Sequence, residues 1–155
     1  MAHDMRDAAV RSRNNMNNPI SVCAEMVFPA LPFIERVRHI RALGFGVEMW
    51  RWEHKDINAL AATGARFTSM SGFLAGNLTD SDGIRMLLTT ARASLAVADK
   101  LDCLNLNLTG SALDASGLPV TPVEALTGSM WLNAATALHE IARLGEQHGR
   151  VFTLG

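Results

Sequence analysis

The chain has 155 residues, of which 48% are hydrophobic, 19% charged and 6% aromatic, and its formal net charge is −1. This length suffices for one domain with its own hydrophobic core. A balanced charge supplies no basic field for nucleic acid, and no stretch reaches the roughly 18 apolar residues that a membrane span needs. The amino terminus also lacks the apolar segment of a secretory signal. We therefore expect a cytoplasmic protein that binds neither nucleic acid nor membranes.

Residues 1–18 are polar and rich in Asn, and we expect them to form a flexible arm before a domain that covers residues 19–155. The two cysteines, Cys23 and Cys103, each lie in an apolar run without a second Cys or a His at metal-ligand spacing. We interpret both as buried, reduced thiols.

From residue 20 onward, the hydrophobic pattern alternates between the period of a strand and the period of a helix. Strands are predicted at 20–26, 45–50, 65–73, 102–110 and 151–154. Between them the pattern predicts helices at 32–44, 57–64, 84–98 and 131–149, three of them closed by a glycine. The last helix is expected to bury Trp131, Ala135, Leu138, Ile141 and Ala142. Strands that alternate with helices predict parallel βα units with right-handed crossovers.

Two architectures fit this order, a doubly wound open sheet and part of a (β/α)8 barrel. Strands of a doubly wound sheet are apolar on both faces, because helices cover both. Here Val47 and Met49 share one face of a strand, while Glu48 and Trp50 share the other. In the fourth strand, Leu104, Leu106 and Leu108 are expected on the face opposite Cys103, Asn105 and Asn107. One apolar face and one mixed face are typical of barrel strands, and no G-x-G-x-x-G motif follows the first strand. The pattern favours half of a (β/α)8 TIM barrel: an α/β fold of about four βα units and a fifth parallel strand.

A half-barrel has consequences for association. A full barrel needs eight strands and about 250 residues. Five strands leave edge strands unpaired and a partly apolar inner face uncovered, and both features promote association. We therefore expect a homo-oligomer, a dimer formed through the open barrel side or the edge strands, or a complex with a separate C-terminal half.

Two segments carry a resemblance to a known family: CAEMVFPALPFIERVRHIRALGFGVEMWRWEHKDINALAATGARFTSMSGFLAGNLTD, and LNLNLTG at the fourth strand. Together they resemble the xylose-isomerase-like TIM-barrel superfamily of sugar isomerases and epimerases, and hydroxypyruvate-isomerase-like proteins in particular. The resemblance covers residues 20–154 but only the N-terminal half of the family's barrel.

This resemblance implies a divalent metal such as Mg²⁺ or Mn²⁺ at the top of a complete barrel, with ligands mostly from strands five to eight. The metal would stabilise an enediolate while carboxylates move a proton between adjacent carbons. The family's fifth strand closes with a metal-binding Glu, and Gly155 occupies the corresponding place here. We therefore expect no metal ligand, no cofactor and no complete acid–base pair within this chain.

Six residues are predicted to contact a substrate: Glu48, Trp50, Arg51, Trp52, Lys55 and Asn107. Glu48 lies on the inner face at the end of the second strand, where it either binds a substrate hydroxyl or pairs with a nearby Arg or Lys. Glu25, at the end of the first strand, has the same two alternatives. The sequence does not decide between substrate binding and ion pairing for either glutamate.

The loop after the second strand contains Trp50, Arg51, Trp52 and Lys55, which either line a pocket and bind an anionic group or only pack the loop. Asn107 faces the barrel interior, where it either binds substrate or is satisfied by Ser69 or Ser71 on the neighbouring strand. A lone His54-x-Asp56 pattern is a poor metal signal. His39, His139 and His148 lie on helices and are expected at the surface or an interface.

Two functions remain open for the chain. It is either a fragment of a hydroxypyruvate-isomerase-like sugar isomerase that is inactive without a C-terminal half, or a non-catalytic half-barrel that homo-oligomerises as a binding or structural protein. The family-like pattern holds to Leu154 and breaks at Gly155, which favours a truncated or frameshifted gene product.

Overall fold

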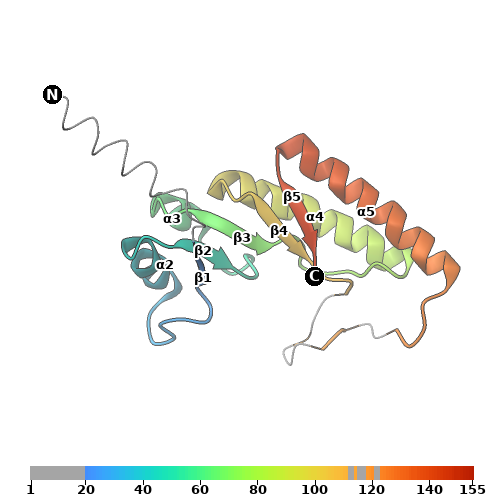
Figure 1. Cartoon of the computed structure of the whole chain (residues 1–155), viewed down its shortest axis with the longest axis horizontal. Helices are drawn as coiled ribbons and strands as arrows, with labels where there is room; N and C mark the ends of the chain where they lie inside the picture. Colours follow the sequence, from blue (N-terminus) through green and yellow to red (C-terminus); the bar gives the residue numbers. More distant parts are fainter. Residues whose placement is uncertain (1–19, 112–113, 115–117, 121–122) are drawn as a thin grey trace.

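The structure, a computed structural model, describes residues 20–111, 114, 118–120 and 123–155. The predicted arm at 1–18 lies outside these residues. In the described part, five parallel strands alternate with four helices (Figure 1). The elements are β1 (Ser21–Cys23), α2 (Phe33–Ala42), β2 (Gly46–Met49), α3 (Ile57–Ala62), β3 (Phe67–Ser71), α4 (Ser81–Leu101), β4 (Asn105–Leu108), α5 (Gly128–His148) and β5 (Val151–Leu154).

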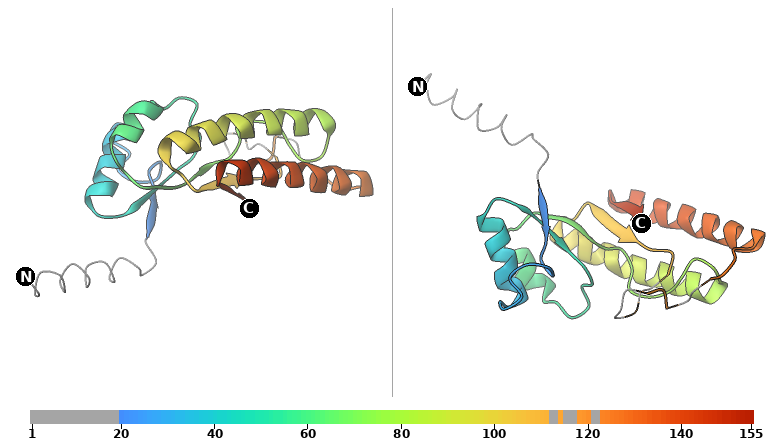
Figure 2. Two further views of the ribbon diagram at one scale, coloured as in Figure 1. Left: turned by 90° about the horizontal axis from the view of Figure 1, so that it is seen from above. Right: turned by 60° about the horizontal axis from the view of Figure 1, so that its bottom comes forward.

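The strands are hydrogen-bonded in the order β1-β2-β3-β4-β5, so each strand pairs with its neighbours in sequence. A doubly wound sheet reverses its strand order at a switch point, and this sheet does not. Buried side chains of all four helices pack against one face of the sheet, and no described helix covers the opposite, inner face (Figures 1 and 2). The predicted half-barrel is therefore confirmed, and the doubly wound alternative is excluded.

The hydrophobic core lies between the sheet and its helices. Val47, Met49, Met70 and Leu106 point from β2, β3 and β4 into this layer and are at most 1% exposed. They contact buried residues of α2, α3 and α4, including Leu95. Burial of an aliphatic side chain of this size contributes about 1.5–3 kcal/mol. This layer fixes which side of each strand faces the helices, and so which side faces the barrel interior.

Local capping explains where the helices begin and end. Asp56 accepts a hydrogen bond from the Ala59 N–H at 2.9 Å, and the Thr127 hydroxyl accepts one from the Met130 N–H at 3.2 Å. Side-chain caps of this kind contribute about 1 kcal/mol each. Gly64 and Gly149 follow α3 and α5 with φ of 64° and 62°, a conformation that favours glycine. Both glycine helix ends agree with the sequence prediction.

The strands are shorter than the sequence pattern predicts. β1 ends at Cys23, because the chain then turns into the loop that leads to α2. In β3 the register with β2 shifts by one residue, because Val47 pairs with Phe67 whereas Glu48 pairs with Ser69. Thr68 is the extra residue of this β-bulge, which bends the sheet locally.

The start of β4 also differs from its prediction. Helix α4 continues to Leu101 and ends at Asp102 in a left-handed conformation with φ of 49°, so the strand begins only at Asn105. As a result, Cys103 is fully buried while Leu104 is 50% exposed. The prediction that Leu104 shares a buried face with Leu106 and Leu108 is wrong, because the alternation starts after the helix cap.

The predicted buried face of α5 is shifted. Its buried and half-buried residues are Met130, Ala134, Ala137, Leu138, Glu140, Ile141, Leu144 and Gly145. Trp131 is 63% exposed, and Ala135 and Ala142 are exposed as well. Trp131 lies in the first turn of α5, and this end of the helix extends past the ends of the strands (Figure 1).

A cluster of charged residues joins α4, α5 and the start of β5 at the N-terminal ends of the strands. Asp99 accepts hydrogen bonds from His148 at 2.6 Å and from Arg150 at 3.2 Å, and Arg150 also pairs with Asp102 at 3.0 Å. Burial acts to raise the pKa of Asp99, but the bonds from His148 and Arg150 outweigh it and lower that pKa. This end of a barrel supports stability rather than chemistry.

Candidate functional site

The inner face of the sheet carries two rows of polar residues. In one row Glu48 pairs with Ser69, which pairs with Asn105. In the other, Ser71, Asn107 and Thr153 are neighbours across β3, β4 and β5. The second row lies nearer the C-terminal ends of the strands, which is the end where barrel enzymes place their active sites.

Hydrogen bonds connect the side chains of this face across the strands. The Asn107 amide donates to Ser69 Oγ at 2.8 Å, and the Thr153 hydroxyl donates to Asn107 Oδ1 at 2.7 Å. Asn105 donates to the Thr68 carbonyl at 2.9 Å. The expected pairing of Asn107 with a serine of β3 is therefore present. Asn107 is also exposed, and its amide keeps one N–H and one lone pair for a ligand.

Glu48 lies in the middle of this face, between Cys23 of β1 and Ser69 of β3. It is partly exposed, and among the described residues its carboxylate has no hydrogen bond and no ion pair. Of the two roles that the sequence leaves open, the structure does not supply the Arg or Lys partner. A carboxylate on a polar, solvent-accessible face can accept hydrogen bonds from substrate hydroxyls.

Burial raises the pKa of the Cys23 thiol, and the charges of Glu25 and Glu48 add to this increase. Burial also raises the pKa of Cys103, to about 11. Both cysteines are free, and Cys103 is buried whereas Cys23 is only half-buried. Neither thiol is activated as a nucleophile, because thiolates need a lowered pKa.

Glu25 connects the first two βα loops. Its carboxylate accepts a hydrogen bond from the Trp50 N–H at 3.1 Å and forms an ion pair with Lys55 Nζ at 2.9 Å. The Lys55 ammonium also donates to the Arg51 carbonyl and lies 4.6 Å from the ring centre of Phe33. Of the two alternatives that the sequence leaves open for Glu25, the structure therefore shows the pair with a nearby Lys.

The other residues predicted in the β2–α3 loop point in different directions. Arg51 pairs with Glu53 at 2.5 Å, and Trp52 donates its indole N–H to Ser94 Oγ of α4 at 2.9 Å. Trp52 therefore packs toward the helical layer, whereas Trp50 is 50% exposed. Burial acts to raise the pKa of Glu53, but backbone and Arg51 hydrogen bonds outweigh it and lower that pKa. The structure thus separates Trp52 from Glu48 and Asn107.

One arginine holds the loop between β1 and α2. The Arg36 guanidinium donates to the Leu31 carbonyl at 2.8 Å, to that of Pro29 at 2.9 Å, and at 3.4–3.5 Å to those of Glu25 and Ala24. The loop includes Phe28, whose φ of 51° is uncommon for a bulky residue.

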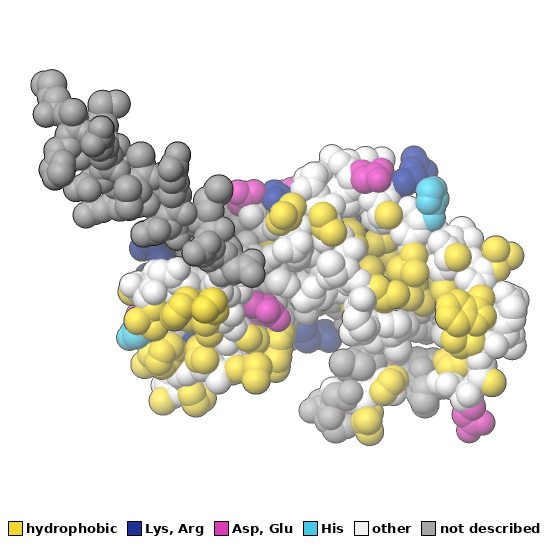
Figure 3. Space-filling view, viewed as in Figure 1, with side chains coloured by type: hydrophobic (Ala, Val, Ile, Leu, Met, Phe, Trp, Pro, Cys, Tyr) yellow, Lys and Arg dark blue, Asp and Glu magenta, His cyan; other side chains and the backbone are white. Residues whose placement is uncertain are grey.

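Exposed apolar side chains gather at both ends of the face seen in Figure 1, over α2 with its preceding loop and over α5 with β5 (Figure 3). Met26 and Phe28 are 73% and 40% exposed at the first end. Val151 and Leu154 are 49% and 55% exposed on the edge strand β5. The second group lies where a further βα unit would continue the sheet.

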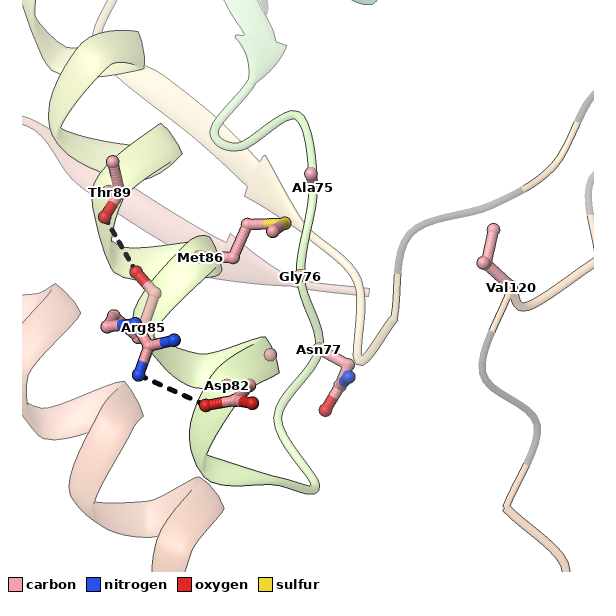
Figure 4. A pocket seen from close by; sticks show the side chains of 9 residues that line it. Ala75, Gly76, Asn77, Asp82, Arg85, Met86, Thr89 and Val120 are labelled. Atoms are coloured by element: carbon pink, nitrogen blue, oxygen red, sulfur yellow. Dashed lines mark hydrogen bonds and ion pairs between the residues drawn. The ribbon is translucent and has the colours of Figure 1, made fainter.

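A hollow of about 690 Å³ lies beside the first turns of α4, away from the inner face (Figure 4). Ala75, Met86 and Val120 line it, together with the ion pair between Asp82 and Arg85 at 3.1 Å. The carboxamide of Asn77, which borders it, is occupied by Thr79 and Asp80. The hollow therefore offers little chemistry, and the inner face is the better candidate.

The described residues do not form a metal site by themselves. Nowhere in this part of the chain do three His, Cys, Asp or Glu side chains come together as ligands. On the inner face, Glu48 could supply one ligand at most. None of the described helices is both long and apolar enough to cross a membrane.

No protein family and no curated protein matches the sequence. Solved structures do match. A 3-keto-D-glucoside 4-epimerase from E. coli is 16% identical, with a TM-score of 0.65 over 88% of this chain and 54% of the epimerase. A xylose isomerase-like TIM barrel/4-hydroxyphenylpyruvate dioxygenase fusion protein is 16% identical, with a TM-score of 0.62 over 88% of this chain and 22% of its own. The chain has the fold of half a TIM barrel. An L-ribulose 3-epimerase is 21% identical, with a TM-score of 0.59 over 87% of this chain and 48% of its own. A probable 3-DHS dehydratase from Bacillus anthracis is 14% identical, with a TM-score of 0.59 over 88% of this chain and 52% of its own.

The half-barrel spans about half the length of the structures that it matches. At these identities the likeness establishes the fold, and the chemistry of a site depends on its residues. The sequence resemblance to this superfamily is thus confirmed at the level of the fold.

Proposed function

We propose that the chain forms one half of a sugar isomerase or epimerase barrel and binds the hydroxyl groups of a small hydroxy-carbonyl substrate on its inner face. The observation that carries this proposal is the carboxylate of Glu48, which has no partner among the described residues and lies beside amide and hydroxyl side chains on the inner face of a barrel sheet. Proteins with this fold that act on sugars, the two epimerases above, support the substrate class.

Glu48 and Asn107 would have different roles in binding the substrate. Glu48 would accept hydrogen bonds from two neighbouring hydroxyls, and the free N–H and lone pair of Asn107 would bind a third. Proton transfer between adjacent carbons needs an acid–base group on the substrate carbon itself. On the described inner face Glu48 is the one unpaired carboxylate, so a second half must complete the pair.

The second half would also supply the metal ligands. A divalent ion such as Mg²⁺ or Mn²⁺ would polarise the substrate carbonyl when bound. Hydroxypyruvate belongs to the class of small hydroxy-carbonyl compounds and is the substrate that the sequence resemblance suggests.

A chimeric barrel tests this proposal. The chain is fused to the C-terminal half of the L-ribulose 3-epimerase, and deuterium exchange at the substrate α-carbon is followed by NMR in D₂O with Mn²⁺. D-Ribulose, D-fructose and hydroxypyruvate serve as substrates. We expect exchange with at least one of them, and Glu48→Gln should raise KM by about tenfold or more, because a hydrogen bond to a charged group is lost. A folded chimera without exchange, or one that Glu48→Gln leaves unchanged, would refute the proposal.

The uncovered β5 edge supports a second candidate, a non-catalytic half-barrel that pairs with another copy. Exposed Val151 and Leu154 on an unpaired edge strand favour association. Light scattering should then give a dimer whose β5 amides are protected from hydrogen exchange. A stable monomer at high concentration would rule this candidate out.

A further inference from the structure

Three described Lys and Arg side chains near the C-terminal ends of β1 and β2 are bonded to other groups of the protein. Lys55 pairs with Glu25, and each side chain of this pair is only 17% exposed. Arg51 pairs with Glu53. Arg36 donates to the backbone carbonyls of the β1–α2 loop. We call the C-terminal ends of β1 and β2 with their loops the rim. The Lys55–Glu25 pair is partly buried and therefore poorly screened, so Glu25 neutralises the positive charge of Lys55 at the rim. The Arg51–Glu53 pair is more exposed, so Glu53 neutralises Arg51 less completely.

The inner face itself offers neutral groups and one negative charge. Ser69, Asn107 and Thr153 supply hydroxyls and an amide, and Glu48 supplies an unpaired carboxylate. A phosphate or carboxylate brought onto this face would approach Glu48 without a free lysine or arginine from the described C-terminal rim. Like charges about 6 Å apart at a partly solvated surface weaken binding by about tenfold per unit charge.

We infer that the inner face of the half-barrel binds a neutral polyhydroxy ligand, an unphosphorylated sugar. We also infer that the Glu25–Lys55 pair prevents the rim from binding anions. The inference rests on the proposed function and narrows its substrate class. It places sugar phosphates, and carboxylates such as hydroxypyruvate, outside the preferred ligands. Glu25 is here a residue that sets specificity through Lys55 and contacts no substrate.

Ligand binding to the chain alone tests the inference without any need for activity. The ¹⁵N-labelled chain is titrated with D-fructose and with D-fructose 6-phosphate, and the Asn107 side-chain amide is followed by NMR after assignment with an Asn107→Ser variant. We expect D-fructose to shift this amide and D-fructose 6-phosphate to bind about tenfold more weakly or not at all.

Three variants separate the causes. Glu25→Gln frees Lys55 while it keeps an oxygen for the Trp50 N–H, and should strengthen binding of the phosphate about tenfold with little change for D-fructose. Glu48→Gln should weaken binding of D-fructose and lessen the discrimination. Glu35→Gln is the matched control, because it breaks the exposed Glu35–Arg38 pair on α2 with the same change of charge, and should alter neither titration.

Preferential binding of the phosphorylated sugar by the unaltered chain would overturn the inference and leave the proposed function standing. So would a Glu25→Gln variant that gains no phosphate affinity. If neither sugar binds the chain at all while the chimeric barrel is active, the inference fails and the proposed function survives. If D-fructose binds as expected while the chimera is inactive, the proposed function fails alone.

Discussion

Truncation of one buried leucine, with a neighbouring leucine as its control, tests the architecture of the sheet most directly. Leu106 is fully buried among side chains of the core, whereas Leu104, two residues before it, is 50% exposed. Leu106→Ala removes three buried carbons and leaves a cavity between the sheet and α4, which should lower the free energy of unfolding by about 3–4 kcal/mol. Leu104→Ala removes the same atoms from a site open to water, and should cost less than about 1 kcal/mol.

The measurement is urea unfolding followed by far-UV circular dichroism, with the m-value compared between variants to confirm that the same surface unfolds. Equal losses for the two variants would mean that both leucines face the core, as simple alternation predicts. That result would refute the register that places the start of β4 at Asn105. A larger loss for Leu104→Ala would refute it more strongly.

Three further predictions concern the helix end, the ion cluster and the thiols. Gly149→Ala should lower the free energy of unfolding by about 1 kcal/mol, because φ is 62° at this residue although no atom blocks a Cβ. The control is Gly128→Ala, where the space is equally open and φ is not positive. In the same urea assay this variant should stabilise α5 or be neutral. The pKa of Asp99 is lowered in the folded chain, so its contribution to stability is present above its unfolded pKa of about 4 and is lost as the pH falls through the folded value. The drop in melting temperature between neutral and acidic pH should therefore be smaller in Asp99→Asn, and an equal drop would contradict the assignment. Because Cys103 is buried with a pKa of about 11, a Cys23→Ser variant should not react with a disulfide reagent at pH 8 until it unfolds; rapid reaction would show that Cys103 is accessible.

Much of this fold is readable from local sequence patterns. The alternation at Val47, Glu48 and Met49 gives the correct inner and outer faces of β2, because each strand meets water on one side and helices on the other. The glycines that end α3 and α5 are equally local, since only the backbone at that residue decides them. Those features needed no knowledge of distant contacts.

The remaining features depend on where elements end. Leu104 was misassigned because α4 runs on to Leu101 and resets the alternation at Asp102. Trp131 fits the helical period of α5, yet it is exposed in the first turn of that helix, the end that extends past the strands (Figure 1). Helix length relative to strand length is a three-dimensional property, and hydrophobic period alone does not contain it.

The candidate site was predicted in part. Glu48 and Asn107 are on the inner face as expected, and the hydrogen bond from Asn107 to Ser69 was among the alternatives. Pairing with an Arg or Lys was among the alternatives for Glu25, but its partner, Lys55, is 30 positions away, and sequence spacing alone does not identify it. Trp52 was grouped with its neighbours in the loop, but the bond to Ser94 turns it toward α4.

The strand order β1-β2-β3-β4-β5 has a further consequence for synthesis on the ribosome. Each new strand finds its pairing partner already made, since the partner is always the preceding strand in sequence. Chains with such sequential contacts can fold progressively as they emerge, without waiting for a distant segment. The sheet can therefore grow one βα unit at a time, and the outer edge of β5 stays free until a partner strand pairs with it.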